Sequence, residues 1–186
     1  MCGEPIGKQD QFAAVFGGNN VYEFNSDHTT RVNNVQISKE ALISFEEKIE
    51  LFYLGEQRSA SNILENQNSK AQSNFKALVE MRNCALQFGL FLEKGDFSNL
   101  GKILNDNWEL KKTLSSGIST PKIDDLIKES LLSGAYGAKL LGAGGTGFIM
   151  TLRKTSVASE VKNVFKLYKS LGPLKISAGV EILYNG

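Results

Sequence analysis

The sequence is poor in the residues that build several common kinds of site. Among its 186 residues it has one histidine, His28, and two cysteines, Cys2 and Cys84. The histidine sits in a polar Ser-Asp-His-Thr run typical of a surface turn, so neither a His-based catalytic triad nor a His-rich metal site is expected. Two widely separated cysteines are too few for a disulfide framework or a zinc site, and we expect reduced thiols.

Charge imbalance and long apolar runs are missing as well. The chain has 21 Lys and Arg against 20 Asp and Glu, a formal net charge of +1. Because no basic tract stands out, neither a nucleic acid nor a membrane surface is the expected partner. No apolar run approaches the roughly 20 residues of a membrane span, and the residues after Met1 are unlike a basic and then apolar leader. These features predict a cytoplasmic protein.

What is present fits one folded domain. A hydrophobic content of 41% and a charged content of 22% are those of a globular protein. Turn signals predict a short first helix with Asp10 at its mouth and Gly17 after its end, and a helix that follows the polar turn over residues 56–64. Periodicity predicts further helices over 39–48, 69–93, 97–114, 121–133 and 157–168, and strands over 21–24, 31–37, 49–54, 138–141, 148–152, 174–177 and 180–184. This order lacks the regular alternation of a doubly wound sheet. It predicts an α+β fold in which an antiparallel sheet packs on helices.

Two helical segments carry side chains whose faces are predicted from spacing. In residues 69–93, apolar side chains recur every three or four positions and are expected to face the core: Phe75, Leu78, Met81, Ala85, Phe88 and Leu92. In the next helix we expect Trp108 to pack in the core, while Lys111 and Lys112 are expected on its solvated face.

An acidic residue stands at the start of the first predicted helix. Asp10 follows a Pro-x-Gly approach and Lys8, and it precedes small and apolar residues that end at Gly17. The N–H groups and partial positive charge of a helix start keep a carboxylate there ionised. Such a carboxylate can orient a sugar hydroxyl and accept its proton. The alternative interpretation is that Asp10 only caps the helix.

A glycine-rich run, Gly-Ala-Gly-Gly-Thr-Gly over residues 142–147, invites a dinucleotide-binding interpretation. A dinucleotide fingerprint requires a helix to start at the last glycine. Here the run passes straight into Phe-Ile-Met-Thr-Leu, which is typical of a strand, so the run is expected to join two strands. Its spacing leaves open whether it is a tight hairpin or a ligand contact.

The whole chain resembles the GHMP-family sugar kinases. Residues 3–18 (Gly-Glu-Pro-Ile-Gly-Lys-Gln-Asp-Gln-Phe-Ala-Ala-Val-Phe-Gly-Gly) are similar to the segment that carries the catalytic aspartate of that family, above all in its heptose 7-phosphate kinases. The resemblance implies that Asp10 is the catalytic base and that Lys8 and Gln11 support substrate binding. It also implies a ferredoxin-like C-terminal domain of the GHMP kinase type, with ATP and Mg²⁺ as cofactors of the intact enzyme.

The glycine run belongs to a second matching segment. Residues 134–148 resemble the third GHMP motif, so the family implies that Gly142, Ala143, Gly144, Gly145, Thr146 and Gly147 wall the phosphate and substrate pocket. Thr146 stands where the family has glycine. If the position required a positive φ, a β-branched residue would be strained there.

Two further segments match the heptose kinases. Residues 53–61 (Tyr-Leu-Gly-Glu-Gln-Arg-Ser-Ala-Ser) match an Arg-Ser-Ala motif at a strand end, and residues 107–119 match a Trp-x-x-Lys-Lys helix. An arginine suits bidentate contact with a phosphate. The resemblance therefore makes Arg58 and Ser59 candidate contacts to a sugar phosphate, with a solvated arginine at a strand end as the alternative for Arg58.

Part of the family pattern is not in the sequence. The family's N-terminal substrate motif and its Pro-x-Gly-x-Gly-Leu-Gly-Ser-Ser phosphate loop are both missing, and no Walker-type loop replaces them. We expect residues 1–20 to form the end of an N-terminal domain and residues 21–186 the C-terminal domain of a kinase that is inactive or nearly so alone. The expected partners are a sugar phosphate, ATP, and either a separate N-terminal half or a second copy. A fucokinase-like enzyme and a non-catalytic sugar-phosphate-binding module are the alternatives.

Overall fold

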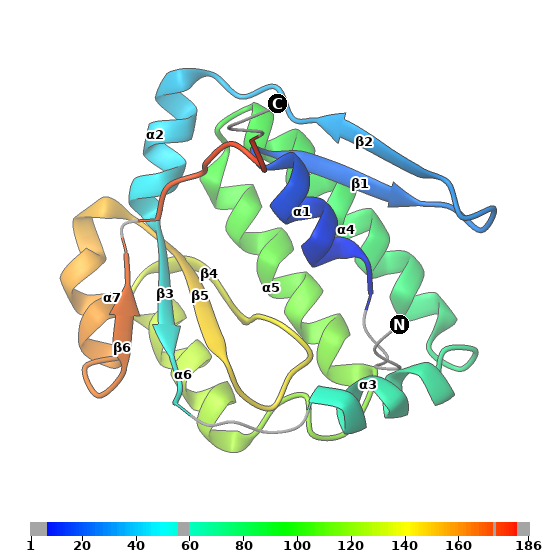
Figure 1. Cartoon of the computed structure of the whole chain (residues 1–186). Helices are drawn as coiled ribbons and strands as arrows, with labels where there is room; N and C mark the ends of the chain where they lie inside the picture. Colours follow the sequence, from blue (N-terminus) through cyan, green and yellow to red (C-terminus); the bar gives the residue numbers. More distant parts are fainter. Residues whose placement is uncertain (1–6, 56–59, 173, 182–186) are drawn as a thin grey trace.

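The computed structural model describes residues 7–55, 60–172 and 174–181, and it arranges helices around a four-stranded antiparallel sheet (Figure 1). The strand order is β4-β5-β3-β6, with β3 at Ile49–Tyr53, β4 at Ala135–Leu140, β5 at Phe148–Arg153 and β6 at Lys169–Leu171. A separate hairpin pairs β1 (Asn20–Phe24) with β2 (Thr30–Asn34), and His28 lies in its exposed turn. The predicted α+β fold with antiparallel sheets packed on helices is confirmed.

Several helices begin at the polar residues that the sequence places there. The Ser38 hydroxyl accepts a hydrogen bond from the backbone N–H of Ala41 at the start of α2 (Lys39–Lys48), and Thr120 does the same for α6 (Pro121–Leu132). Asp96 caps α5 (Phe97–Thr113). These caps satisfy N–H groups that the first turn of a helix leaves without partners. The other helices are α1 (Gln9–Phe16), α3 (Ala60–Ser69), α4 (Phe75–Glu93) and α7 (Ala158–Val164), the last preceded by a 3₁₀ turn at Thr155–Val157.

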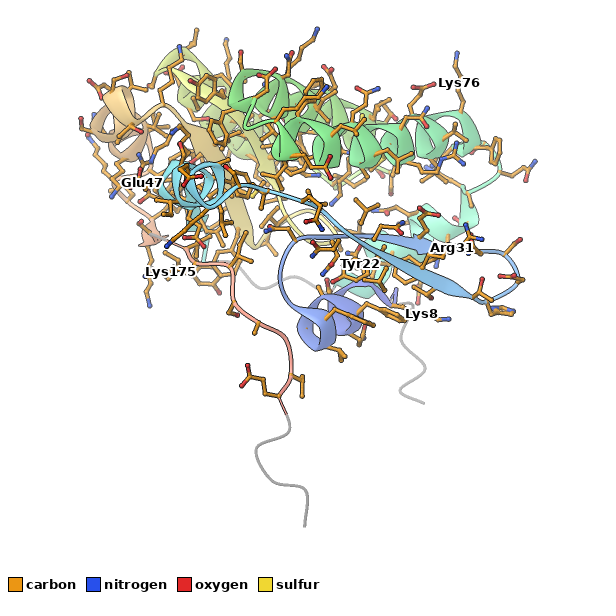
Figure 2. All side chains as sticks on the ribbon, turned by 90° about the horizontal axis from the view of Figure 1, so that it is seen from above. Lys8, Tyr22, Arg31, Glu47, Lys76 and Lys175 are labelled. Atoms are coloured by element: carbon orange, nitrogen blue, oxygen red, sulfur yellow. The ribbon has the colours of Figure 1, made fainter. Side chains whose placement is uncertain are left out.

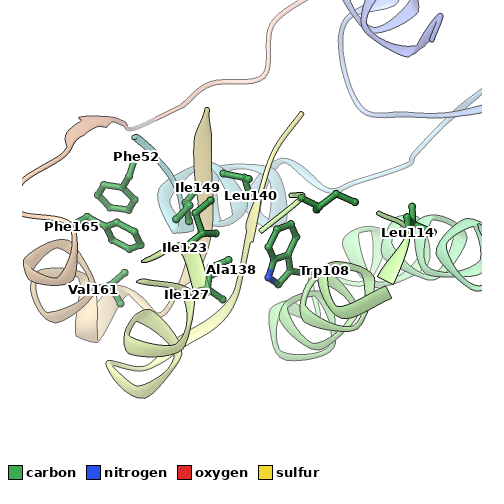
Figure 3. Packing of buried hydrophobic residues seen from close by; sticks show 11 residues of the cluster. Phe52, Trp108, Leu114, Ile123, Ile127, Ala138, Leu140, Ile149, Val161 and Phe165 are labelled. Atoms are coloured by element: carbon green, nitrogen blue, oxygen red, sulfur yellow. The ribbon is translucent and has the colours of Figure 1, made fainter. Parts of the chain in front are cut away.

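The core has two buried clusters. One lies between the sheet and helices α5, α6 and α7, where the rings of Phe52 and Phe165 stack 4.0 Å apart and Trp108 packs from α5 (Figure 3). The other joins α2, α4, α5, the hairpin and the sheet around Phe45, Leu100 and Leu152. The predicted core position of Trp108 is therefore correct.

Two sequence predictions are wrong in part. The helix predicted over 69–93 begins later than expected, because α3 ends at Ser69 and α4 runs without a break from Phe75 to Glu93. Its apolar stripe is only partly core: Leu92 is buried, but Phe75 is 65% exposed and Leu78 is 39% exposed. Near the C-terminus no strand forms over 174–177; the short strand β6 lies just before that segment. The strand predicted over 180–184 falls mostly outside the described residues.

Helix α5 and strand β4 approach each other more closely than side chains would allow. A Cβ atom on Gly101 would lie 2.4 Å from the backbone of Tyr136, and one on Gly137 would lie 2.4 Å from the carbonyl oxygen of Gly101. The pairing of β4 with β5 is irregular between Ala135 and Gly137. The Asn105 side chain stabilises this irregularity, because it donates to the Tyr136 carbonyl (3.2 Å) and accepts from the Ala138 N–H (3.0 Å).

We predict that Gly101→Ala destabilises the fold by about 1–3 kcal/mol or more, because the added methyl group meets backbone that cannot move aside. Gly89→Ala in α4 is the matched control, since its Cβ would meet side-chain methyl groups of Val21 at 3.2 Å and Val35 at 3.8 Å and no backbone, and alanine favours the helix by about 1 kcal/mol. Urea denaturation measures both. Equal midpoints for the two variants would contradict the close packing of α5 on β4.

Candidate active site

Asp10 lies in the first turn of α1, and its side chain is exposed. Lys8, also exposed, is the residue from which the helix starts, and Figure 2 shows it in the layer that α1 forms with the hairpin. The side-chain amide of Gln11 is oriented with its nitrogen toward the backbone. It donates to the carbonyl oxygens of Gly7 (3.1 Å) and Lys8 (3.0 Å). Gln11 thus stabilises the helix start, and Asp10 is not the residue that caps it.

A cleft of about 550 Å³ separates this layer from the helices behind it. Gln9 and Ala13 of α1 line one wall together with Tyr22 of β1. Side chains of the opposite wall come from α4, α5 and β4, and among them are Cys84, Asn107 and Lys139. The volume is within the range of small-molecule sites, and the wall is mostly apolar with a few polar groups.

The glycine run joins β4 to β5 and is a hairpin loop, as predicted. Gly144 has a φ of 120°, and a Cβ atom there would lie 2.8 Å from the Cα of Ile118, so the position requires glycine. His28 is the one non-glycine residue with positive φ in the described chain. Thr146 therefore lies in an ordinary conformation, and its substitution for glycine does not strain the loop.

Four elements hold the loop in place. The Gly145 N–H donates to the Ile118 carbonyl (2.9 Å), and the Gly147 carbonyl accepts from the N–H of Leu54 after β3 (2.9 Å). The Gln67 amide of α3 donates to the Ala143 carbonyl at 3.3 Å. Lys111 Nζ of α5 donates to the Gly142 carbonyl. Since its carbonyl groups are bound from several sides, the loop is fixed before any ligand arrives.

Two lysines meet between the cleft and the loop. Lys139, on β4, donates through Nζ to Asn107 Oδ1 of α5, and Lys111 follows Asn107 by one helical turn. Both side chains are half-buried. The prediction that Lys111 lies on a solvated face is therefore wrong, because tertiary packing places the end of α5 against the loop.

Burial lowers the pKa of Lys111. Burial, and then the charge of Lys111, lower the pKa of Lys139 to about 8. The neighbouring Lys112 differs: partial burial lowers its pKa, but the carboxylates of Glu109 (2.8 Å) and Asp124 (3.5 Å) outweigh this and raise it. On the same wall, burial raises the pKa of the Cys84 thiol, which keeps it protonated.

None of the predicted site residues that the structure describes lines the cleft, whose lining from α1 is Gln9 and Ala13 and from β4 is Lys139. The helix that carries Asp10 and the strand that leads into the loop at Gly142 both line the cleft. Arg58 and Ser59 lie outside the described residues. Sequence reasoning missed Lys139 and Asn107, although both lie inside segments that match the family, and a lysine inside an otherwise apolar strand was the signal for Lys139.

Residues 90–169 match the profile of one protein family, described as GHMP kinases C terminal. The chain carries a GHMP kinase C-terminal domain. It is 31% identical over 145 residues to the D-glycero-alpha-D-manno-heptose 7-phosphate kinase of Campylobacter jejuni, a match over 77% of this chain and 43% of that protein. It is 34% identical over 116 residues to the L-fucokinase/L-fucose-1-P guanylyltransferase of Bacteroides fragilis, over 59% of this chain and 12% of that protein.

Solved structures share the fold of this GHMP domain. A D-glycero-D-manno-heptose 1-phosphate kinase from Bacteroides thetaiotaomicron superposes with a TM-score of 0.68 at 24% identity and covers 96% of this chain and 50% of that one. The mevalonate kinase of L. major with R-mevalonate also gives a TM-score of 0.68, at 18% identity, over 91% of this chain and 53% of that one. The chain thus spans about half, or less, of the length of these relatives.

Two kinds of feature are absent from the residues that the structure describes. None of the helices there is both long and apolar enough to cross a membrane. Nor do three or more His, Cys, Asp or Glu side chains gather there in a group that could hold a metal ion.

We predict that Lys139→Met raises the melting temperature at pH 7 and that this gain fades between about pH 8 and 10.5. Below pH 8 the wild-type lysine is protonated in the folded and in the unfolded chain. The folded chain therefore carries the full free-energy cost of the buried charge. Above pH 8 the folded chain has released this proton while the unfolded chain still binds it, and the cost disappears.

Thermal melts across this pH range measure the difference, and about 1 kcal/mol corresponds to roughly 2–4 °C for a chain of this size. Lys112→Met is the control, because removing a lysine with two carboxylate partners gives no gain. A gain for Lys139→Met that did not change with pH would mean that apolar packing, not charge, causes it.

Proposed function

We propose that this chain is the C-terminal half of an ATP-dependent sugar kinase that phosphorylates the anomeric hydroxyl of a heptose phosphate. The observation that supports this proposal most directly is the cleft. The helix that carries Asp10 lies on one wall, and β4, which carries Lys139 and leads into the glycine loop, lies on the other. The Campylobacter relative, named a heptose 7-phosphate kinase, supports the choice of sugar. A fucose-type sugar is the alternative that the Bacteroides relative suggests. A cytoplasmic location is part of the proposal.

In this proposal Asp10 orients the acceptor hydroxyl and takes its proton while the oxygen bonds to the γ-phosphorus of ATP. The bond between that phosphorus and the β–γ bridging oxygen breaks, and ADP leaves. Lys8 and Gln11 support the helix that presents Asp10, and Arg58 and Ser59 remain candidates for contact with the sugar phosphate. Because the described residues gather no group of metal ligands, we assign Mg²⁺ no ligand from this part of the chain.

The proposal also needs the part of the kinase that this sequence does not match. The phosphate loop of the family is absent from the 186 residues, and positioning of the nucleotide phosphates is most of the catalysis of phosphoryl transfer. We propose that residues 1–20 belong structurally to that other part and residues 21–186 to the C-terminal domain. The chain alone is then inactive or nearly so.

We predict that the chain alone gives no ATP-dependent phosphorylation of heptose 7-phosphate, whereas a mixture with the N-terminal half of the Campylobacter relative does. In the active mixture Asp10→Asn lowers kcat by about 10²–10⁴. Asp125→Asn, an exposed carboxylate on α6, is the control and leaves kcat unchanged. Coupled detection of ADP measures the rate, and steady turnover by the chain alone would refute the two-part enzyme.

An exposed aromatic surface marks where the other half would dock. We call it the aromatic face: Phe12, Phe16, Tyr22 and Phe24, whose rings lie 5.4–6.3 Å apart, on α1 and β1. Phe16 is 51% exposed and Phe24 is 46% exposed, and α1 has no buried residue. A contiguous exposed apolar surface of this kind commonly marks a site of interaction with another protein. It therefore favours a kinase half over an independent binding module.

We predict that Phe16→Ser weakens association of the chain with the N-terminal half by at least tenfold, since burial of one phenylalanine is worth about 1.5–3 kcal/mol. Leu167→Ser is the matched control, because Leu167 is 86% exposed and follows α7, away from α1 in Figure 1. Sedimentation velocity of the mixtures measures association. Equal binding by both variants, or self-association through the aromatic face instead, would contradict this docking surface.

A further inference from the structure

Lys139 lies on the wall of the cleft, and Lys111 lies beside the first residue of the glycine loop. The charge of Lys111 lowers the pKa of Lys139, so the two ammonium groups are electrostatic neighbours. The two side chains come from different elements, α5 and β4, which the contact of Gly101 with Gly137 holds together. Each ammonium group donates to a neutral oxygen, Lys111 to the Gly142 carbonyl and Lys139 to the Asn107 amide. An ammonium group has three N–H donors, so each keeps donors for another acceptor.

No carboxylate among the described residues pairs with either lysine. Some half-buried or buried charges of the described residues are paired with an opposite charge, whereas the half-buried Lys48 instead donates to Ser44 and lies over the Phe97 ring. Lys112 has Glu109 and Asp124. The buried Glu50 carboxylate accepts from Arg153 Nε (3.0 Å) and lies 3.2 Å from Lys162 Nζ. Two like charges in a partly desolvated site are costly unless an anion neutralises them. The lysine pair is therefore a site that lacks its negative charge.

The two lysines do not form a structural ion pair with a carboxylate of the described residues. We propose that Lys111, Lys139 and the amide nitrogen of Asn107 bind a phosphate group of a substrate. The inference rests on the proposed function and identifies residues that it leaves unassigned. A phosphate monoester carries close to two negative charges at neutral pH, which matches two ammonium groups. Its oxygens accept several hydrogen bonds at once, whereas a single carboxylate balances only one charge.

The position of the pair favours a ligand that also occupies the cleft. Lys139 and Asn107 line the cleft, and Lys111 connects them to the first residue of the glycine loop. A phosphate between the two lysines would lie beside that loop, while the remainder of the molecule extends toward Tyr22 and Gln9. Both a sugar phosphate and a nucleotide supply this chemistry, and the experiment separates them.

The experiment measures binding by the full 186-residue chain, without turnover. Titration calorimetry at pH 7 with mannose 6-phosphate, with ADP and with inorganic phosphate is compared for wild type, Lys111→Met, Lys139→Met and Lys112→Met. Loss of one charged hydrogen bond is worth about 1.5–3 kcal/mol. We therefore expect Kd for the phosphate ligand to rise at least tenfold in the first two variants. The Lys112 variant should stay within about twofold of wild type.

Two additions keep the result decisive if a methionine variant is poorly folded. Lys111→Arg and Lys139→Arg retain the charge and should keep binding within about fivefold, and mannose without phosphate should bind equally weakly to all variants. Lysine dependence for mannose 6-phosphate would assign the site to the sugar phosphate. Lysine dependence for ADP alone would assign it to the nucleotide. Either outcome supports the phosphate site.

Absence of phosphate binding by wild type, or equal Kd values for wild type and both methionine variants, would overturn the inference. These results are distinguishable from failure of the proposed kinase activity. A chain whose lysines bind phosphate but whose mixture with an N-terminal half transfers none retains the site and loses the kinase assignment. Turnover by the mixture that does not change when either lysine is replaced would retain the kinase assignment and rule out the phosphate site.

Discussion

The contact between α5 and β4 at Gly101 and Gly137 is the constraint on which the site depends. It brings a helix backbone onto a strand backbone with no side chain between them, and Asn105 satisfies the polar groups where the strand pairing is irregular. The contact also sets the direction of the later turns of α5, which follow Gly101 on the same helix. Asn107 and Lys111 thereby reach the Lys139 ammonium group and the Gly142 carbonyl, groups that no local signal would bring together.

Tertiary packing, and not the overall charge of the chain, therefore decides which charged side chains meet at the site. The chain as a whole is nearly neutral, and Lys112, one residue away from Lys111, has two carboxylate partners. The lysine pair nevertheless lies in a half-buried position without a carboxylate from the described residues. Holding two like charges in this half-buried position costs free energy, and a bound anion would offset that cost. Such arrangements of perturbed charges are common at functional sites.

Local signals predicted much of the fold, and tertiary contacts decided the rest. Ser38 and Thr120 cap helices because the cap needs only the neighbouring backbone, and the glycine run is a hairpin as its flanking strands indicated. The stripe of Phe75 and Leu78 was misjudged because periodicity shows that a face is apolar but not that anything covers it. Lys111 was misjudged for the converse reason, since a basic helix end gives no sign of what packs against it.

If Asp10 is the base of the proposed kinase, its exposed position leaves the carboxylate in open water in this chain. An ionised carboxylate in open water is hydrated, so it must release water before it contacts a sugar hydroxyl, and its charge is screened. Helix α1 has no buried residue, and it carries Phe12 and Phe16 of the aromatic face as well as Asp10. Asp10 lies about a third to half a turn around α1 from Phe12 and Phe16, so a partner that covered only the rings would leave the carboxylate in water. In the proposed two-part enzyme, a partner that extends around α1 would bury apolar area and exclude water from Asp10 in the same step.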